Sequence, residues 1–293
     1  MSEMELKENF DKFIDIEKLF EQKNASLARM LPGFVFSYIK RIMHQDEIND
    51  FLWENRSLQS IEFLNKVNAY FNVTIDLIGK ENFPVDTKTV FAANHPLGGL
   101  EGILLTNIIA NHYGDARVPV NDLLLSVKNF KPLFIPINKH GSTSKEAIKI
   151  FDATYATDIP LLMFPSGYVS RKRKGVIKDI DWRKTFLTKA IKHGRSITPT
   201  FITGENSPFF YNLNILREAL GIKANLEMFF LANELFKKQN GHLKAYFGPA
   251  IEASYFDKRY TPVKWAKLVQ EYAYSLVEKP KRNFEQFVLE TEE

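Results

Sequence analysis

The sequence contains no cysteine among its 293 residues. This absence excludes disulfide bonds, thiolate nucleophiles and zinc sites built from cysteine. The six histidines are scattered along the chain, and no two of them have the spacing of metal ligands on one helix. We therefore expect no metal centre, and a setting that is reducing or indifferent to redox conditions.

Long hydrophobic runs are also missing. The longest apolar stretches, 34–39 and 103–110, fall well short of the ~18 to 20 residues that a transmembrane helix needs. The first residues, MSEMELKENFDKF, are acidic and lack the basic start and apolar run of a secretory signal. We expect no export, and we expect any contact with a membrane to be peripheral.

Two catalytic signatures are absent as well. No G-x-x-x-x-G-K-[ST] occurs, which excludes a Walker A phosphate loop, and no G-x-S-x-G occurs, so Ser166 is a poor candidate for a nucleophile. The net charge of +4 is mild, but basic residues cluster at 171–174. This cluster favours an anionic surface or substrate, and no recognition motif or aromatic-interleaved groove accompanies it to indicate nucleic acid.

The order of sequence patterns predicts an α/β fold. Residues 1–72 show helical periodicity only, whereas from Thr74 onward short β-rich runs alternate with helical stretches. We predict a mostly parallel central sheet flanked by helices in a domain of residues 73–293, with an N-terminal helical region at 1–72. The expected strands are 74–78, 89–93, 117–120, 133–137, 161–164, 197–201 and 243–247. The expected helices are 100–112, 144–155, 184–193, 210–220, 226–238 and 262–277.

The N-terminal region contains one amphipathic stretch of particular interest. Between residues 28 and 43 the apolar side chains gather broadly on one side, and basic residues lie near the ends. Such a helix fits a lipid headgroup layer or the surface of a protein core equally well. Asp46 and Ser57 are the expected N-caps of the two helices that follow.

The most informative stretch is FAANHPLGGLEG at 91–102. A buried strand ends at His95, and Pro96, Gly98 and Gly99 form a tight turn before the next helix. Glu101, six residues after His95, is placed to return to the imidazole and fix its tautomer, leaving the other ring nitrogen to accept a proton. The alternative is an ordinary solvated turn histidine.

Other polar loops follow strands in the same manner. LLMFPSGYVSRKR at 161–173 passes from a strand into the turn at Ser166 and Gly167 and then into cations, which suits a phosphate or carboxylate. A plain turn with a solvated basic loop remains the alternative. Because loops after parallel strands share one edge of a sheet, several side chains are expected to face a common cleft. These are His95, Lys139, Ser166, Arg171 and Asn206.

These motifs resemble those of the glycerophospholipid acyltransferase superfamily, over about residues 75–250. The superfamily's NH-x4-D motif corresponds to Asn94-His95 followed by Glu101, and its FPEG motif corresponds to FPSG at 164–167. LFIPINK, with Lys139, matches the second motif, and ITPTF matches the fourth. Two departures are that the carboxylate is Glu, one residue further along than usual, and that FPSG lacks the acidic residue.

One branch of the superfamily is more similar than the rest. HPLGGLE, FPSGYVSR, DIDW at 179–182 and GENS at 204–207 resemble the bacterial lyso-ornithine-lipid and lyso-glycine-lipid O-acyltransferases, often labelled hemolysins. The resemblance implies an acyl thioester donor, on acyl carrier protein or CoA, and a lyso-lipid acceptor at the cytoplasmic face of the inner membrane. It implies no cofactor beyond this co-substrate.

The resemblance also implies roles for single residues. His95, oriented by Glu101, would deprotonate the acceptor hydroxyl. The remaining candidates would bind substrate or the oxyanion, and they are Asn94, Gly98, Gly99, Lys139, Ser166, Gly167, Arg171, Arg173 and Asn206. Two alternatives remain, a 1-acylglycerol-3-phosphate acyltransferase that makes phosphatidic acid, and a catalytically weak lipid-binding protein on the same fold.

Overall fold

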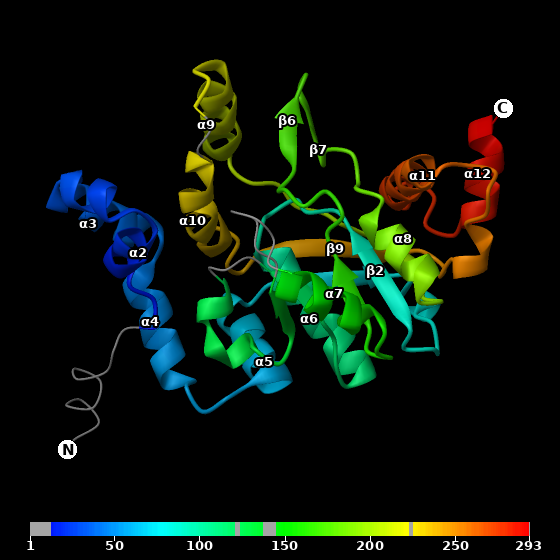
Figure 1. Ribbon diagram of the computed structural model, residues 1–293, viewed down its shortest axis with the longest axis horizontal. Helices are drawn as coiled ribbons and strands as arrows, with labels where there is room; N and C mark the ends of the chain where they lie inside the picture. Colours follow the sequence, from blue (N-terminus) through cyan, green and yellow to red (C-terminus); the bar gives the residue numbers. More distant parts are fainter. Residues whose placement is uncertain (1–12, 121–123, 137–144, 223–224, 293) are drawn as a thin grey trace.

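The structure is a computed structural model that describes residues 13–120, 124–136, 145–222 and 225–292. Its main sheet has five strands in the order β1-β9-β8-β2-β5. Neighbouring strands run parallel except for β8 and β9, which pair antiparallel. Helices flank this sheet (Figure 1). The predicted α/β class with a mostly parallel sheet is confirmed. The strands of the main sheet are β1 (Thr74–Ile78), β2 (Thr89–Ala93), β5 (Leu161–Met163), β8 (Ser196–Ile202) and β9 (His242–Phe247).

Strand β2 is buried along its whole length, because successive side chains point into two different cores. Phe91 and Ala93 belong to a core shared with the helices α5 (Ser60–Phe71) and α6 (Leu100–Tyr113). Val90 and Ala92 belong to a second core. Burial on both faces fixes the register of β2, since a slip by one residue would exchange the two sets of side chains.

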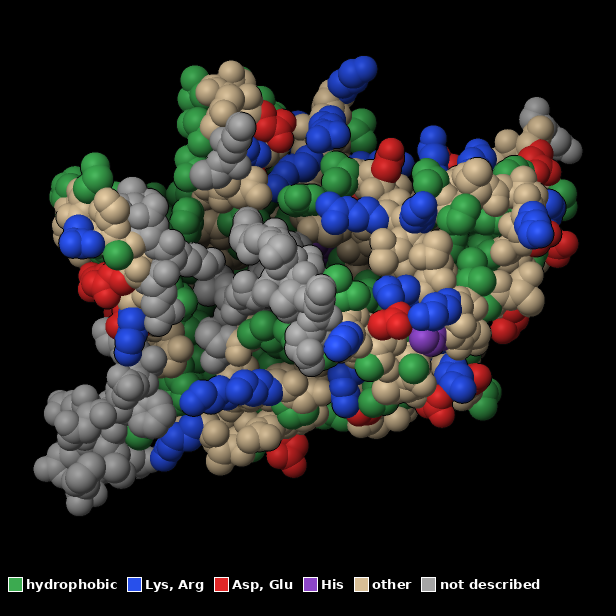
Figure 2. Space-filling view, viewed as in Figure 1, with side chains coloured by type: hydrophobic (Ala, Val, Ile, Leu, Met, Phe, Trp, Pro, Cys, Tyr) green, Lys and Arg blue, Asp and Glu red, His purple; other side chains and the backbone are tan. Residues whose placement is uncertain are grey.

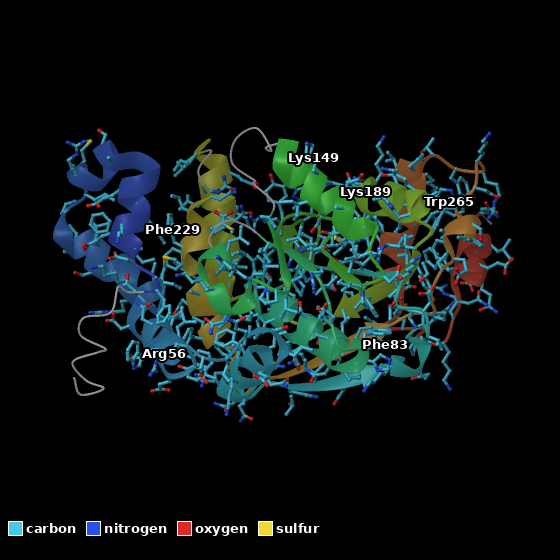
Figure 3. All side chains as sticks on the ribbon, turned by 60° about the horizontal axis from the view of Figure 1, so that its bottom comes forward. Arg56, Phe83, Lys149, Lys189, Phe229 and Trp265 are labelled. Carbon is cyan, nitrogen blue, oxygen red and sulfur yellow. The ribbon has the colours of Figure 1, made fainter. Side chains whose placement is uncertain are left out.

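The second core lies under α8 (Thr185–Lys192), α11 (Pro262–Ser275) and α12 (Phe284–Glu292). Trp265 of α11 is 1% exposed and packs against several aromatic rings there (Figure 3). Each large apolar side chain buried in this way contributes about 1.5–3 kcal/mol of hydrophobic stabilisation. The helix α12 had no counterpart among the expected elements.

The N-terminal helices differ from the prediction. The stretch 28–43 is not one helix, since α2 (Ile16–Met30) ends before Pro32, which is the N-cap of α3 (Gly33–Ile42). A proline at this place lacks the N–H that a continuous helix would need. The helices α2 and α3 contact the segment after α9, where Phe20 stacks on Phe229 at 5.5 Å between ring centroids (Figure 3).

Both expected N-caps are wrong. The N-cap of α4 (Gln45–Glu54) is His44, in the left-handed conformation, and Asp46 lies in the first turn. Ser57 precedes the helix α5, whose N-cap is Gln59. The acidic first turn of α4 places Asp46 and Glu47 near the positive end of the helix dipole, which is the other stabilising position for a carboxylate.

The remaining elements are short strands, 3-10 turns and helices around the main sheet. Residues 171–178, predicted as a basic loop, form an antiparallel hairpin of β6 (Arg171–Arg173) and β7 (Val176–Lys178). A short parallel pair, β3 and β4, extends the sheet through a bridge from Arg117 to Leu161. The expected helix 226–238 begins as a 3-10 turn, η4. The bounds are β3 (Val118–Val120), β4 (Phe134–Pro136), α7 (Lys145–Tyr155), α9 (Pro208–Ala219), η4 (Leu226–Phe230), α10 (Leu231–Phe236), η1 (Lys80–Asn82), η2 (Leu124–Ser126), η3 (Lys128–Phe130) and η5 (Ala253–Tyr255).

Within the described part of the chain, none of the helices is both long enough and apolar enough to span a membrane.

Candidate active site

The site is built around the turn that joins β2 to α6. His95 follows the end of β2, and Glu101 lies in the first turn of α6. The His95 Nδ1 atom is 2.8 Å from the Glu101 Oε1 atom, which is the contact that the six-residue spacing predicts. The Glu101 side chain is fully buried, and the His95 side chain is 15% exposed. The structure therefore pairs a partly accessible imidazole with a buried carboxylate.

Backbone N–H groups of the turn bind the same carboxylate. Leu97 and Gly98 donate to Glu101 Oε1 at 2.9 and 2.8 Å, and Gly99 donates to Oε2 at 3.0 Å. Burial by itself raises the pKa of Glu101, but the charge and hydrogen bond of His95 and the N–H donors outweigh it, so the pKa lies below the usual value of 4.5. Glu101 is therefore ionised at neutral pH.

The charge of Glu101 determines the tautomer of His95. An ionised carboxylate only accepts hydrogen bonds, so the His95 Nδ1 atom carries the hydrogen in this contact. In the neutral ring Nε2 then has the free lone pair and can accept a proton. Phe164, at the start of FPSG, stacks on the imidazole with 4.4 Å between ring centroids and so limits its rotation. This arrangement can serve a general base.

A second buried carboxylate, Asp179, holds the backbone of His95. Both of its oxygens lie 3.2 Å from the His95 N–H, and it also accepts from Ser170 Oγ at 2.5 Å and Trp182 Nε1 at 3.0 Å. The N–H of Ser170 donates to the carbonyl of His95 at 2.8 Å. Sequence reasoning did not assign Asp179 to the site, although the DIDW motif contains it and was the available signal.

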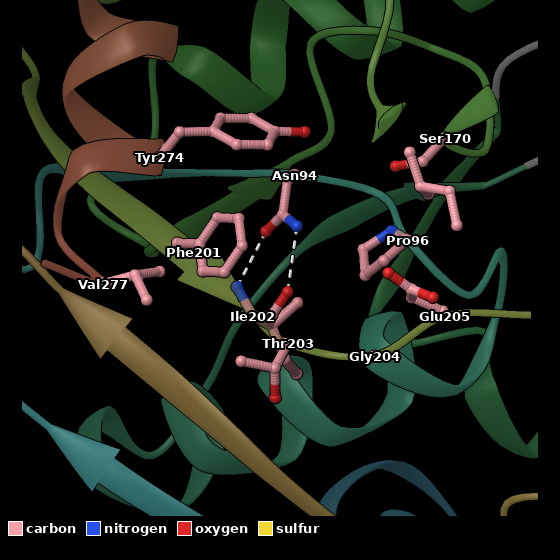
Figure 4. A pocket seen from close by; sticks show the side chains of 11 residues that line it. Asn94, Pro96, Ser170, Phe201, Ile202, Thr203, Gly204, Glu205, Tyr274 and Val277 are labelled. Atoms are coloured by element: carbon pink, nitrogen blue, oxygen red, sulfur yellow. Dashed lines mark hydrogen bonds between the residues drawn. The ribbon is translucent and has the colours of Figure 1, made fainter. Parts of the chain in front are cut away.

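Asn94 and Asn206 bind backbone groups around the same segment, and their role in binding substrate stays a prediction. Asn94 accepts from the N–H of Ile202 at 2.7 Å and donates to its carbonyl at 2.9 Å (Figure 4). Asn206 donates from Nδ2 to the carbonyls of Pro96 and Leu97 at 3.4 and 3.3 Å. Both side chains are buried, and both bind backbone groups, although the Asn206 Oδ1 atom has no hydrogen-bond partner among the described residues.

The glycines predicted to bind an oxyanion are also engaged elsewhere. The N–H groups of Gly98 and Gly99 point at Glu101, and the N–H of Gly167 donates to the carbonyl of Phe164 at 2.9 Å. Position 98 requires glycine for its backbone conformation and for space. Its φ is +89°, and a Cβ atom there would lie 2.7 Å from a methyl carbon of Val169. These three N–H groups are therefore not free for an oxyanion in this structure.

The FPSG turn likewise bonds within itself. Ser166 is fully buried, and its Oγ donates to the carbonyl of Tyr168 at 2.8 Å. Gly167 has a φ of +68°, and an added Cβ atom there would lie 3.7 Å from the guanidinium carbon of Arg183. Ser166 is thus a turn residue in this structure, and a contact with substrate stays a prediction.

The predicted cations do not all meet. Arg171 is 6% exposed and turns inward to Glu227, with 3.0 Å between Nη2 and Oε1, although its Nη1 has no hydrogen-bond partner among the described residues. An isolated buried cation is costly, so this ion pair explains the inward position of Arg171, and its role in binding substrate stays a prediction. Arg173 is exposed on β6. Lys139 lies outside the described residues.

A pocket of about 270 Å³ lies beside the turn that joins β2 to α6 (Figure 4). Asn94 and Pro96, the neighbours of His95 in the sequence, line it together with Ser170, Phe201 and Tyr274. Its walls therefore include the segments that hold the backbone of His95. Among the described residues there is no group of three or more His, Asp or Glu side chains arranged to hold a metal ion.

Comparison with known proteins decides the family. A sequence profile for a family described as "Acyltransferase" matches residues 18–277. The chain belongs to this acyltransferase family. Two relatives of this chain are named lyso-glycine lipid O-acyltransferase. The protein from Phocaeicola vulgatus is 42% identical over 264 residues, which cover 90% of this chain and 95% of the relative. The protein from Bacteroides thetaiotaomicron is 40% identical over 264 residues, covering 90% and 97%.

A solved structure, the 1-acyl-sn-glycerophosphate acyltransferase PlsC from Thermotoga maritima, aligns with 84% of this acyltransferase and 93% of its own chain, at 14% identity and a TM-score of 0.45.

Proposed function

We propose that this acyltransferase transfers a fatty acyl group from a thioester to the hydroxyl of a lyso-aminoacyl lipid, with a lyso-glycine lipid as its acceptor. The observation that carries the proposal is 40–42% identity over 90% of the chain to two proteins named lyso-glycine lipid O-acyltransferase. The paired His95 and Glu101 supply the chemistry that such a transfer needs.

In the proposed mechanism His95 Nε2 takes the proton of the acceptor hydroxyl as its oxygen attacks the thioester carbonyl carbon. Glu101 stabilises the imidazolium that forms, because its carboxylate remains ionised and hydrogen-bonded to Nδ1. The tetrahedral intermediate then expels the thiolate, the C–S bond breaks, and the thiolate takes the proton back from Nε2. The products are the diacyl lipid and the free thiol.

The donor in this proposal is acyl carrier protein or CoA, and no further cofactor takes part. Arg173, and Lys139 outside the described residues, are the cations that we assign to the phosphate of the phosphopantetheine arm or to the anionic group of the acceptor. The reaction takes place at the cytoplasmic face of the inner membrane, where the donor is made and the acceptor is embedded. Met30 at the end of α2 and Phe34 in α3 are 77% and 75% exposed, which suits contact with a lipid surface.

A direct assay with the purified protein tests this proposal. Acyl carrier protein and CoA thioesters are offered with lyso-glycine lipid, lyso-ornithine lipid or lyso-phosphatidate, and release of the free thiol is measured. We expect kcat/KM for lyso-glycine lipid to exceed that for lyso-phosphatidate by about tenfold or more. Equal use of lyso-phosphatidate would contradict the acceptor, and no thiol release with any acceptor would favour a lipid-binding protein.

The same assay tests the general base. His95→Ala should lower the transfer rate about 100-fold or more, because a positioned base commonly contributes that much. His193→Ala is the control, since His193 lies at the end of α8 near Asp152 and away from the turn. A His95→Ala rate within a few-fold of wild type would remove the base from the mechanism.

A further inference from the structure

The helix α9 exposes an apolar stripe. Phe209, Leu216 and Leu220 recur at spacings of seven and four residues, which place them on one side of the helix, and they are 50%, 56% and 65% exposed. Ile215, on another side of the helix, is also exposed. Single exposed apolar residues are ordinary, but a contiguous set on one helix marks a surface that contacts something apolar.

A different side of α9 is held in place by buried polar and charged groups. Asn214 and Arg217 bind the fully buried Glu227, at 3.1 Å from Asn214 Nδ2 and 2.9 Å from Arg217 Nε. Glu227 also binds Arg171 of β6. Turning the stripe inward would leave these charges buried without partners, which is strongly unfavourable. The outward direction of the stripe is therefore a fixed property of the fold.

The β6–β7 hairpin next to α9 is basic. The guanidinium of Arg171 lies 5.8 Å from the ring centroid of Phe210, which joins the two elements. Lys172, Arg173 and Lys174 are exposed, and the hairpin RKRKGVIK contains no acidic residue. Figure 1 shows α9 and the hairpin projecting from the same side of the molecule. Figure 2 shows basic side chains over the hairpin and hydrophobic side chains along α9.

We propose that α9 and the β6–β7 hairpin together form a contact with a lipid bilayer that carries anionic headgroups. Phe209, Leu216 and Leu220 enter the interface, and Lys172 and Lys174 pair with the headgroups. Such a bilayer offers an apolar interior for the side chains of α9 and negative headgroups for the cations of the hairpin. An acidic protein would complement only the charge of the hairpin. The inference rests on the proposed function and deepens it, because it adds a lipid contact to that of the N-terminal helices.

This contact has a consequence for the site. The helix α9 begins directly after Asn206 and Ser207, and Asn206 binds the carbonyls of Pro96 and Leu97 in the catalytic turn. A bilayer that meets α9 therefore lies at a fixed distance from His95. An acceptor whose acyl chain stays in the bilayer can then present its hydroxyl to the base without leaving the membrane entirely.

Vesicle binding of the full chain tests the proposal. Co-sedimentation is measured with phosphatidylcholine vesicles and with vesicles that also contain phosphatidylglycerol, at low and high salt. Leu216→Asp/Leu220→Asp should weaken binding to both vesicles about tenfold or more, because two carboxylates replace aliphatic groups that enter the bilayer. Lys172→Glu/Lys174→Glu should weaken binding about tenfold or more only where phosphatidylglycerol is present, and this loss should shrink in high salt.

Matched substitutions elsewhere serve as controls. Leu289→Asp removes a similarly exposed leucine from α12, and Lys258→Glu/Lys264→Glu reverses two exposed charges near the start of α11. These variants should bind vesicles like wild type. Circular dichroism and the unfolding temperature show that each variant is folded. Variants of α9 and the hairpin that bind like the controls would overturn the proposal.

Two further measurements separate this inference from its alternatives. If the hairpin variant raises KM for acyl carrier protein thioester and leaves vesicle binding intact, the hairpin binds acyl carrier protein. That result overturns the proposal. Wild-type transfer between short-chain, water-soluble substrates is measured without vesicles. Absence of that transfer counts against the proposed function, whereas the vesicle measurements still decide the lipid contact.

Discussion

Two buried carboxylates hold the His95 segment, and their pKa values shift in opposite directions. Glu101 binds the imidazole and three backbone N–H groups at the start of α6, and its pKa is lowered. Asp179 accepts the His95 N–H and two side-chain donors, but burial raises its pKa above the usual 3.8. Both side chains are buried, so their partners decide the direction of the pKa shift. Glu101 alone combines the imidazole with the positive end of a helix.

This difference suggests that the two carboxylates have different roles. The charge of Glu101 is part of the proposed chemistry, because it fixes the tautomer of His95 and stabilises the imidazolium. Asp179 does not touch the ring and is a positioning residue, which keeps the backbone of His95 in place against Ser170 and Trp182. The two carboxylates should therefore respond differently to substitution and to pH.

The largest effect should come from the charge of Glu101. Glu101→Gln should lower the transfer rate about 100-fold, because the tautomer of His95 is no longer fixed and the imidazolium loses its partner. It should also reduce the free energy of unfolding by about 2 kcal/mol, since charge-assisted hydrogen bonds in the turn are lost. Thiol-release kinetics and urea denaturation measure both quantities.

Glu101→Asp is the matched control, because it keeps the charge and shortens the reach by one methylene group. An intermediate rate would support the electrostatic role. A Gln variant as active as the Asp variant would show that shape, and not charge, is what matters at this position.

A smaller effect is expected for Asp179→Asn. The amide keeps one acceptor but presents an NH₂ group toward donors such as His95 N–H and Trp182 Nε1. We expect kcat to fall about tenfold through displacement of the imidazole, with KM for the acceptor changed far less. Asp181→Asn, at an exposed neighbour, is the control. A loss of about 100-fold or more with an altered pH profile would instead place Asp179 in the proton transfer.

The smallest effect is a pair of opposite pH dependences in the free energy of unfolding. Because the folded-state pKa of Glu101 is lowered, its contribution is present above pH 4.5 and is lost as the pH falls through the folded-state value. Because the pKa of Asp179 is raised, its contribution declines as the pH rises from 3.8 through the folded-state value. Urea denaturation from about pH 3 to 7 measures both.

Relative to Glu101→Gln, the wild type should gain stability with rising pH, and relative to Asp179→Asn it should lose stability. Slopes of the same sign would contradict the contrast between the two carboxylates.

Local patterns in the sequence predicted the central part of the site. The apolar run before His95, the glycine turn and the six-residue spacing to Glu101 all lie within twelve residues at 91–102, so turn geometry and helix start determine the contact. The alternation of strands and helices predicted the α/β class for the same reason. Short segments of sequence contain these signals, because backbone propensity and the periodic spacing of apolar side chains depend on neighbouring residues.

Partners distant in the sequence were not predicted. Asp179 reaches His95 across 84 positions, and Asn94 reaches Ile202 across 108. Arg171 was expected to face a cleft. Its ion pair with Glu227 was not foreseen, because Glu227 lies 56 positions later in the sequence. Such pairings depend on which strands and helices pack side by side.

The sequence by itself determined the α/β class, the His95–Glu101 pair and the absence of cysteine chemistry. Only the tertiary structure decided that Asp179 holds the backbone of His95, that the turn glycines bind Glu101, and that α9 turns apolar side chains outward. The physical reason is that a buried polar group must find a partner wherever the packed chain offers one, and a local pattern does not contain that information.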